Sequence, residues 1–321
     1  MKKLVIFCLV LFCISAFKAT EFPEAEISNG IVKVNIYLPD SEIGYYRATR
    51  FDWSGVIKSL SYKGHSYFGE WFKKHDPSKH DAITGPVEEF DPIGYDEARV
   101  GEKFLKIGVG SLRKSNTKPY SSYGLYEIEN HGKWGVKKRS DKIEISHELT
   151  DDFGYSYLYT KTISVVKGKP EMLLEHTLKN TGQRLIKGDV YNHNFFVMDN
   201  QQTGTDIKIK FPFEIQGSGK GLGQYAQVED KEIKYLRNLK DNENVHIPIL
   251  RGYGTEVKDN DFRIENHKSG AGVRILGDKP LSRMVFWSSS TTSCPEPYIH
   301  ISINPGQKMR WTNTYQFYEI P

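Results

Sequence analysis

Two short segments that lie far apart in the chain each contain one side chain able to exchange a proton. Residues 191–196 read Tyr-Asn-His-Asn-Phe-Phe and include His193, and residues 294–298 read Cys-Pro-Glu-Pro-Tyr and include Glu296. Histidine titrates near neutral pH, and a carboxylate accepts protons readily. If the fold brings them together, this imidazole and this carboxyl can act as acid and base on one small molecule.

His193 has an ordinary structural interpretation as well, as a core histidine whose hydrogen bonds are satisfied. Asn192 and Asn194 flank it, and on a strand both would point to the face opposite His193. Three polar side chains would then need partners on the two faces of one strand. Buried strands rarely carry such a load, so we favour a proton-transfer role for His193.

Glu296 lies between Pro295 and Pro297. The two prolines restrict the backbone and remove nearby donors, which suits either a surface turn or a preorganised base. Trp287 is close enough in sequence to provide a stacking floor for a ligand. Cys294 is interpreted as a small core residue rather than as a nucleophile.

A second group of carboxylates occurs in a loop expected over residues 72–101. Glu88 and Glu89 precede Phe-Asp at 90–91, with Gly-Pro before them and Pro-Ile-Gly-Tyr after them. Carboxylates accept hydrogen bonds from sugar hydroxyls, and aromatic faces stack on sugar rings. Sugar contact and an acidic surface turn therefore both remain open for this segment.

Two further segments resemble ligand sites less well. His75 and His80 have aspartate neighbours but lack the spacing of known zinc sites, so we expect a solvated loop and no metal. The glycine-rich residues 217–223 match neither nucleotide-binding pattern, and we expect a flexible hairpin loop there.

Most of the chain reads as β-strand. Residues 31–37, 142–146, 206–211 and 298–303 alternate polar and apolar side chains, and residues 155–166 are rich in types that favour strands. Amphipathic helix is scarce, with one or two turns expected over residues 231–239. The pattern predicts an all-β fold in which residues 20–321 form a single large antiparallel sandwich.

The N-terminal residues resemble an export signal. Lys2 and Lys3 precede an apolar run over residues 4–17, so we expect residues 1–19 to be a signal peptide and the protein to be periplasmic or secreted. A lipid anchor at Cys13 is the alternative, although the bulky Phe12 disfavours it. After cleavage Cys294 would be the one cysteine left, so no internal disulfide is expected.

Composition excludes other classes of function. The 321-residue chain has a formal charge of +4, well mixed in sign, with none of the basic stripes that nucleic-acid binding calls for. After the expected signal peptide, no stretch of the sequence approaches the ~18 consecutive apolar residues of a membrane-spanning helix.

Several segments together resemble one family, the aldose 1-epimerases or galactose mutarotases. Residues 192–196, Asn-His-Asn-Phe-Phe, resemble that family's Asn-His-x-Tyr/Phe-Phe motif, and residues 176–182 resemble the strand and turn that precede it. Residues 283–317, in which Glu296 is followed by a Pro-Gly turn and a closing strand, resemble its C-terminal end. The resemblance covers residues 27–320 and is strongest in the second half.

This resemblance implies a galactose mutarotase-like β-supersandwich and interconversion of the α and β anomers of a free sugar or sugar acid. Glu296 would remove the proton of the C1 hydroxyl, and His193 would protonate the ring oxygen, so that the ring opens and recloses on the other face. A small-molecule carbohydrate is the implied partner, with no metal or organic cofactor. We expect a monomer or weak dimer.

The first half departs from the family pattern. The expected Asn-x-Leu-His-Gly-Gly and Gly-Arg-x-x-Asn-Arg motifs are missing, and residues 85–90 and 94–98 stand in their place. Recognition of the sugar hydroxyls must then differ, and we assign it to Arg50, Glu89 and Tyr95, with Asn192 and Trp287 nearby. The missing motifs keep a non-catalytic carbohydrate-binding protein, or a lyase or hydrolase accessory on a related sandwich, as alternatives.

Overall fold

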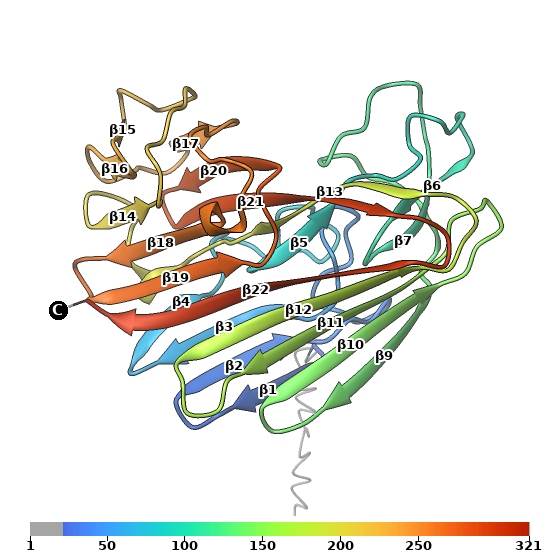
Figure 1. Cartoon of the computed structure of the whole chain (residues 1–321), viewed down its shortest axis with the longest axis horizontal. Coiled ribbons are helices and arrows are strands. Elements are labelled where there is room, and N and C mark those ends of the chain that lie inside the picture. Colours follow the sequence, from blue (N-terminus) through green and yellow to red (C-terminus); the bar gives the residue numbers. More distant parts are fainter. Residues whose placement is uncertain (1–21, 321) are drawn as a thin grey trace, which may run out of the picture.

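The computed structural model describes residues 22–320 and is built almost wholly of antiparallel strands. Two layers of sheet face each other, and Figure 1 shows β13 and β21 running above the long strands β22, β12, β11 and β10. The expected all-β supersandwich is confirmed. The expected signal peptide, residues 1–19, lies outside the described residues.

One layer is a ten-stranded sheet in which the central strands are the longest. In spatial order its strands are β15 (Ala226–Glu229), β16 (Glu232–Tyr235), β14 (Ile207–Lys210), β18 (Asp261–Asn266), β19 (Ala271–Gly277), β22 (Lys308–Glu319), β12 (Glu171–Asn180), β11 (Tyr157–Val165), β10 (Lys142–Leu149) and β9 (Lys133–Lys138).

The facing layer combines a five-stranded and a four-stranded sheet, which a bridge between Phe68 and Phe196 joins. The five-stranded sheet has the order β17 (Asn244–Ile247), β20 (Arg283–Ser289), β21 (Thr292–Ile303), β13 (Ile186–His193) and β5 (Val87–Phe90). The four-stranded sheet has the order β1 (Glu24–Ser28), β2 (Val32–Tyr37), β3 (Val56–Tyr62) and β4 (His65–Phe68). A small third sheet contains β6 (Lys103–Lys106), β7 (Gly110–Arg113) and β8 (Ile128–Asn130). Short 3-10 turns occupy Met198–Asn200 and Val257–Asp259.

The core lies between the two layers and follows from the period-two pattern of the strands. In β11 every second residue from Tyr157 to Val165 is buried, while the residues between them are more exposed. Ile145 and Ile163 of the large sheet pack in one cluster with Ile36 and Ile57 of the opposite layer. Each such side chain stabilises the fold by roughly 1.5–3 kcal/mol.

Two sequence-based expectations about local structure were wrong. Residues 231–239, expected to form helical turns, contain strand β16, because Ile233 and Tyr235 face the core with a spacing of two rather than three or four. The loop expected over residues 72–101 contains strand β5, which is buried along its whole length. Among the described residues, no helix has the length and apolar character needed to cross a membrane.

Candidate active site

The floor of the candidate site is one face of the five-stranded sheet. Tyr191 of β13 pairs with Tyr298 of β21, and further along Phe196 and Ser293 exchange two backbone hydrogen bonds of 3.2 Å each. The register is the same at both places. It therefore puts His193 directly opposite Glu296 on neighbouring strands.

Two prolines shape this contact. Pro295 and Pro297 occupy the positions of β21 opposite Asn194 and Asn192, where an ordinary residue would donate a backbone hydrogen bond to β13. The side-chain amide of Asn194 adds a different contact between the two strands, since it donates to the Pro295 carbonyl at 2.7 Å. Of the two interpretations left open for this segment, the surface turn is wrong. The segment is the middle of a central strand, in which the missing donors face β13 and the ladder to β20 continues through both prolines.

His193 and Glu296 are in direct contact. His193 Nε2 lies 3.3 Å from Glu296 Oε1, and the two side chains are 5% and 6% exposed. The imidazole stacks on Phe195 at 3.7 Å between ring centroids, and Trp287 contacts it edge-on. Nδ1 of His193 is buried without a hydrogen-bond partner among the described residues. The ring orientation is therefore set by aromatic packing and by Glu296.

The protonation of this pair is set mainly by burial. Burial raises the pKa of Glu296 to about 8, although Arg50 acts in the opposite direction. Burial also holds the pKa of His193 well below its usual value, and the positive charge of Arg50 lowers it further. Both groups are therefore uncharged at neutral pH, with one proton on Glu296 and the His193 imidazole neutral.

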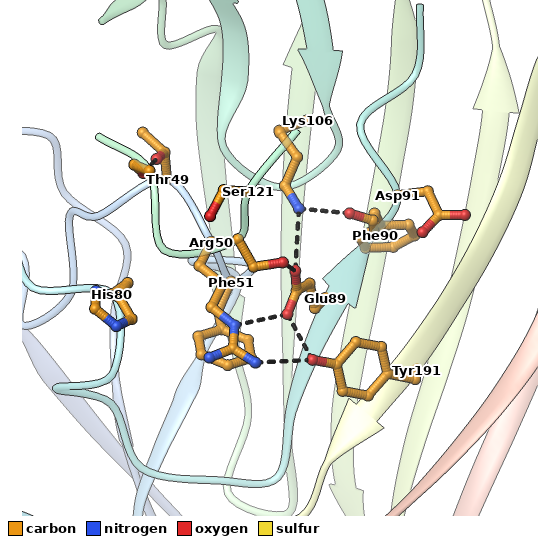
Figure 2. Close-up of polar contacts among 12 residues, drawn as sticks. Thr49, Arg50, Phe51, His80, Glu89, Phe90, Asp91, Lys106, Ser121 and Tyr191 are labelled. Atoms are coloured by element: carbon orange, nitrogen blue, oxygen red, sulfur yellow. Dashed lines mark hydrogen bonds and ion pairs between the residues drawn. The ribbon is translucent and has the colours of Figure 1, made fainter. Parts of the chain in front are cut away.

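Glu89 is the centre of a second hydrogen-bonded cluster in the site, and Figure 2 shows Glu89 with its partners Arg50, Lys106 and Tyr191. It accepts from Arg50 Nε at 2.7 Å and from the Tyr191 hydroxyl at 2.5 Å, and its other oxygen accepts from Ser122 at 2.7 Å. Burial raises the pKa of Glu89, but Arg50 and Lys106 outweigh that effect and lower it to about 2. Glu89 is thus a fixed negative charge, in contrast to the protonated Glu296.

Arg50 connects several of these groups. Besides Glu89 it binds Asp81, with 2.8 Å between Nη1 and Oδ1, and its Nη2 donates to the Tyr191 hydroxyl at 3.2 Å. Its guanidinium carbon lies 4.5 Å from the centre of the Phe51 ring. The planar group is held on three sides, which fixes the charge that acts on His193 and Glu296.

These residues line one cavity of about 640 Å³. His193 and Glu296 lie on its floor, Arg50 and Glu89 on one side, and Trp71 and Trp287 form an aromatic corner, with 5.3 Å between the two indole ring centroids. Cavities of this size hold small organic ligands. Polar groups that converge on the floor and aromatic faces at the side match what a sugar ring requires.

Several solved structures have a similar fold. The galactose mutarotase related enzyme from Lactobacillus acidophilus aligns with a TM-score of 0.55 and 11% identity, over 93% of this chain and 99% of that one. A galactose mutarotase-like protein from Clostridium acetobutylicum gives a TM-score of 0.54 at 10% identity, over 94% and 100% of the two chains. The GalM/aldose epimerase homologue from C. elegans gives 0.53 at 12% identity, over 93% and 99%.

This chain has the galactose mutarotase-like fold. The likeness is one of structure, since no protein-family model matches the sequence and no curated protein matches it either. At identities of 10–12% the chemistry has to be argued from the residues of this chain.

Five of the seven residues selected from sequence line the cavity of this mutarotase-like fold: Arg50, Glu89, His193, Trp287 and Glu296. Glu89 was expected in a loop, but it lies on strand β5 opposite Tyr191, and this position makes it part of the cavity lining. Their roles in binding and catalysis stay predictions.

Tyr95 and Asn192 lie elsewhere. Tyr95 packs edge-on against Phe104 and Tyr120 at 5.0 and 5.4 Å, and its hydroxyl donates to the Lys118 carbonyl, so it belongs to the packing beneath the neighbouring loops. Asn192 follows Tyr191 on β13 and therefore points to the other face of the sheet.

Asn192 belongs to a polar layer inside the sandwich. Its amide donates to Glu88 Oε1 at 2.9 Å, and its own oxygen accepts from Asn313 of β22 at 2.6 Å. Glu88 also binds His176 Nε2 at 2.8 Å and forms a short ion pair with Lys161. Every charge in this layer is paired, as burial requires, and the layer supports the strand that holds Glu89.

Sequence reasoning missed several residues of the cavity. Tyr191 and Tyr298 stack at 4.2 Å between ring centroids, and each lies two positions from a proposed catalytic residue, on the same strand face. Period-two alternation alone would have found them. Asp81, Tyr123 and Arg283 also line the cavity. Asp81 was weighed from sequence only as a possible metal ligand beside His80, and no local pattern marked Tyr123 or Arg283 as cavity residues.

The structure also bears on two other interpretations of the sequence, a metal site near His75 and a nucleophilic role for Cys294. No group of three or more histidine, cysteine, aspartate or glutamate side chains that could hold a metal occurs in residues 22–320. His75 stacks on Tyr45 at 4.0 Å between ring centroids, and its Nε2 bonds the Tyr45 carbonyl at 2.8 Å. Cys294 is buried, and burial raises the pKa of its thiol, which disfavours a nucleophilic role.

Proposed function

We propose that this protein is an aldose 1-epimerase-like isomerase, which interconverts the α and β anomers of a free sugar or sugar acid. The observation that carries the proposal is the contact between His193 and Glu296 on the floor of one sugar-sized cavity. The mutarotase-like fold supports it, although a shared fold alone does not define an activity.

The separation of the pair suits the reacting atoms. The C1 hydroxyl and the ring oxygen of a pyranose are bonded to the same carbon, so they lie closer together than a hydrogen-bond length of about 2.8 Å. Two protein groups 3.3 Å apart can address both oxygens at once from one side. A ring placed over the pair meets one proton donor and one proton acceptor.

Anomer exchange needs a single proton on this pair. In ring opening the C1 hydroxyl loses a proton, the ring oxygen gains one, and the bond between C1 and the ring oxygen breaks to leave an aldehyde. In the resting pair the proton is on Glu296, so it must first pass to His193 across the 3.3 Å contact. Glu296 then takes the proton of the C1 hydroxyl and His193 gives its proton to the ring oxygen, which returns the pair to the state favoured by burial, with its proton on Glu296. Ring closure after rotation about C1–C2 runs the same transfers backward.

Arg50 and Glu89 would then bind and orient the sugar. Glu89 is a charged acceptor and Arg50 a charged donor at the edge of the cavity, both already held by their neighbours. Trp71 and Trp287 offer flat apolar faces to the C–H side of the ring. Groups that are fixed before the sugar binds lose little entropy on binding.

The test is anomer exchange measured by saturation-transfer NMR across a panel of free aldoses and uronic acids. We expect His193→Gln and Glu296→Gln each to slow exchange ~10²–10⁴-fold, the usual contribution of a positioned proton transfer. His300→Gln and Glu175→Gln change the same residue types at exposed positions outside the cavity and should exchange at the wild-type rate. Equal rates in all five proteins would rule the proposal out.

The low exposure of the pair favours one second candidate, a carbohydrate-binding protein without catalysis. With side chains 5% and 6% exposed, His193 and Glu296 could act as buried hydrogen-bonding groups beneath a bound sugar. This candidate predicts tight sugar binding by calorimetry, no catalysed exchange, and an affinity that Glu296→Gln leaves unchanged.

We further infer export from the leader-like sequence at residues 1–19. Expression of the full chain in a bacterium, followed by N-terminal sequencing of the protein in the periplasmic fraction and the medium, tests this. Retention of the full-length chain in the cytoplasm would contradict it.

A further inference from the structure

One wall of the cavity carries positive charge that is separate from the Arg50 cluster. Lys220, His246 and Arg283 line this wall. The Lys220 carbonyl accepts the backbone N–H of His246 at 3.0 Å, so the loop is tied to strand β17. Arg283 is the first residue of β20 and lies opposite Tyr298 of β21.

The cations of this wall have no acidic partners. Among residues 22–320, neither Lys220 nor Arg283 has a carboxylate oxygen within 4.0 Å of its side-chain nitrogens, whereas Arg50 has two such partners. The guanidinium of Arg283 lies 4.3 Å from the centre of the Tyr298 ring and donates to its hydroxyl at 3.2 Å. Most of its five N–H donors are left for a ligand.

The other charges of the cavity do not neutralise this wall. Glu89 and Asp81 bind Arg50. Asp91 accepts the backbone N–H of Asp189 at 2.7 Å and, among residues 22–320, forms no ion pair within 4.0 Å with Lys220 or Arg283. The pKa of His246 is lowered by burial and then by Arg283 and Lys220, so an uncompensated positive field acts at this position. In a concave site such a field concentrates anions.

The wall is also at a suitable distance from the catalytic pair. Tyr298 lies two residues beyond Glu296 on the same face of β21, about 7 Å along the strand. Arg283 is its neighbour on the adjacent strand. A long arginine side chain there reaches over the space of one sugar unit placed on His193 and Glu296.

We propose that this wall binds the anionic substituent of an acidic sugar, a carboxylate or a phosphate, with Arg283 and Lys220 as its ligands. The proposal rests on the function proposed above and narrows its substrate class. Arginine matches the two oxygens of a carboxylate or phosphate with two parallel hydrogen bonds, and lysine adds a point charge. A neutral sugar would leave both cations without a counter-charge.

Calorimetric titrations with D-glucose, D-glucuronate and D-glucose 6-phosphate, repeated in the galactose and mannose series, test this proposal. We expect at least one anionic sugar to bind tenfold or more tightly than its neutral parent, with an affinity that falls as salt is added. The preferred anion distinguishes a carboxylate site from a phosphate site. Affinities that do not differ between neutral and anionic members, or binding of neither, would overturn the proposal.

Substitutions of single residues in the wall test whether the anion binds there. Arg283→Gln and Lys220→Gln should each weaken binding of the anionic sugar at least threefold and binding of its neutral parent much less. Arg139→Gln, at an exposed position in the turn between β9 and β10, should alter neither affinity. If Arg139→Gln weakens anion binding as much as Arg283→Gln, the charge effect is general and the wall is not the site.

A second readout separates this proposal from the proposed catalysis. A bound anion next to His246 should raise the pKa of that imidazole, which an NMR titration of its C2 proton measures with and without glucuronate or glucose 6-phosphate. A rise without catalysed exchange would support the anion site and count against the isomerase. Catalysed exchange of anionic sugars with no change in the pKa of His246 would support the isomerase and count against the anion site.

Discussion

The imidazole of His193 and the carboxyl of Glu296 lie 3.3 Å apart, and the single proton of the pair resides on the carboxyl at neutral pH. An adjacent imidazole normally favours an ionised carboxylate. Here burial outweighs that attraction, because the free energy needed to hold two charges away from water is larger than the free energy gained from their contact. The predictions below follow from this balance and from the groups that support it.

The rate of anomer exchange should depend on pH through the pair as a unit. Loss of its one proton near pH 8, the pKa of Glu296, should reduce kcat/KM at higher pH. Because the pKa of His193 is well below its usual 6.5, activity should persist as the pH falls through 6.5. Saturation-transfer NMR from pH 5 to 9.5, corrected for uncatalysed exchange, measures the profile, and an acidic limb centred at 6.5 would contradict it.

Glu296→Gln should stabilise the protein while it slows the proposed anomer exchange. The pKa of Glu296 is raised from 4.5 to about 8 in the fold, so between these values the folded chain holds a proton that the unfolded chain has released. The free energy of unfolding of the wild type should therefore fall, relative to the variant, as the pH rises from 4.5 to 8. We expect the variant to be roughly 1–3 kcal/mol more stable at pH 8.

Urea unfolding of both proteins at pH 4.5 and pH 8 measures this difference. Groups that titrate in the same way in the wild type and the variant contribute equally to both free energies of unfolding and cancel from the difference. Glu175→Gln, at an exposed site, should give no comparable gain. A variant less stable than the wild type at pH 8 would show that Glu296 is ionised in the fold.

Arg50→Met should destabilise the fold and weaken sugar binding together. The change leaves Glu89 buried with Lys106 at 3.8 Å as its remaining cation. Removing one partner of a buried ion pair typically costs about 3–5 kcal/mol. Arg113→Met, which breaks a more exposed pair with Glu129, should cost less than about 1 kcal/mol. Similar losses in the two variants would mean that the Arg50 cluster is not fixed in the way described.

The polar layer beneath the cavity floor should behave as one coupled unit. Lys161→Met leaves Glu88 without its cation in the interior, and we expect a loss of about 3–5 kcal/mol. Glu88→Gln combined with Lys161→Met should recover a large part of that loss, because no unpaired charge remains. A double-mutant cycle by urea unfolding tests this, and simple additivity of the two single changes would contradict it.

Much of the fold follows from local alternation in the sequence, as in Tyr157–Val165 of β11. Strand β5 does not, because Glu88 and Glu89 are unusual in a buried strand, and their partners Lys161 and Arg50 lie far away in the chain. The Pro-Glu-Pro segment also gave no sign of a central strand, since proline is normally confined to edge strands and bulges. Its place in a central strand depends on Asn194, which a local pattern does not reveal.

The candidate site was predictable to a similar extent. His193, Glu296 and Trp287 stood out by residue type and by resemblance, and Arg50 and Glu89 by their polar character in an aromatic context. Asn192 could have been excluded by alternation once His193 was placed on a strand. The pairing of Arg283 with Tyr298, and the loop that brings Lys220 to the wall, depend on tertiary contacts.

The shared register of β13, β20 and β21 separates the residues that line the cavity from the residues that pack the interior. On these strands Tyr191, His193, Glu296 and Tyr298 face the cavity, and the residues between them face the interior. Val285 and Tyr298 are packed with Tyr191 in a buried cluster, so exchanges at the more exposed Arg283 and Trp287 should alter ligand preference with the least repacking. A single inserted residue between Cys294 and Glu296 would instead turn the carboxyl inward and a proline outward, so specificity in this scaffold should evolve by substitution and not by changes in strand length.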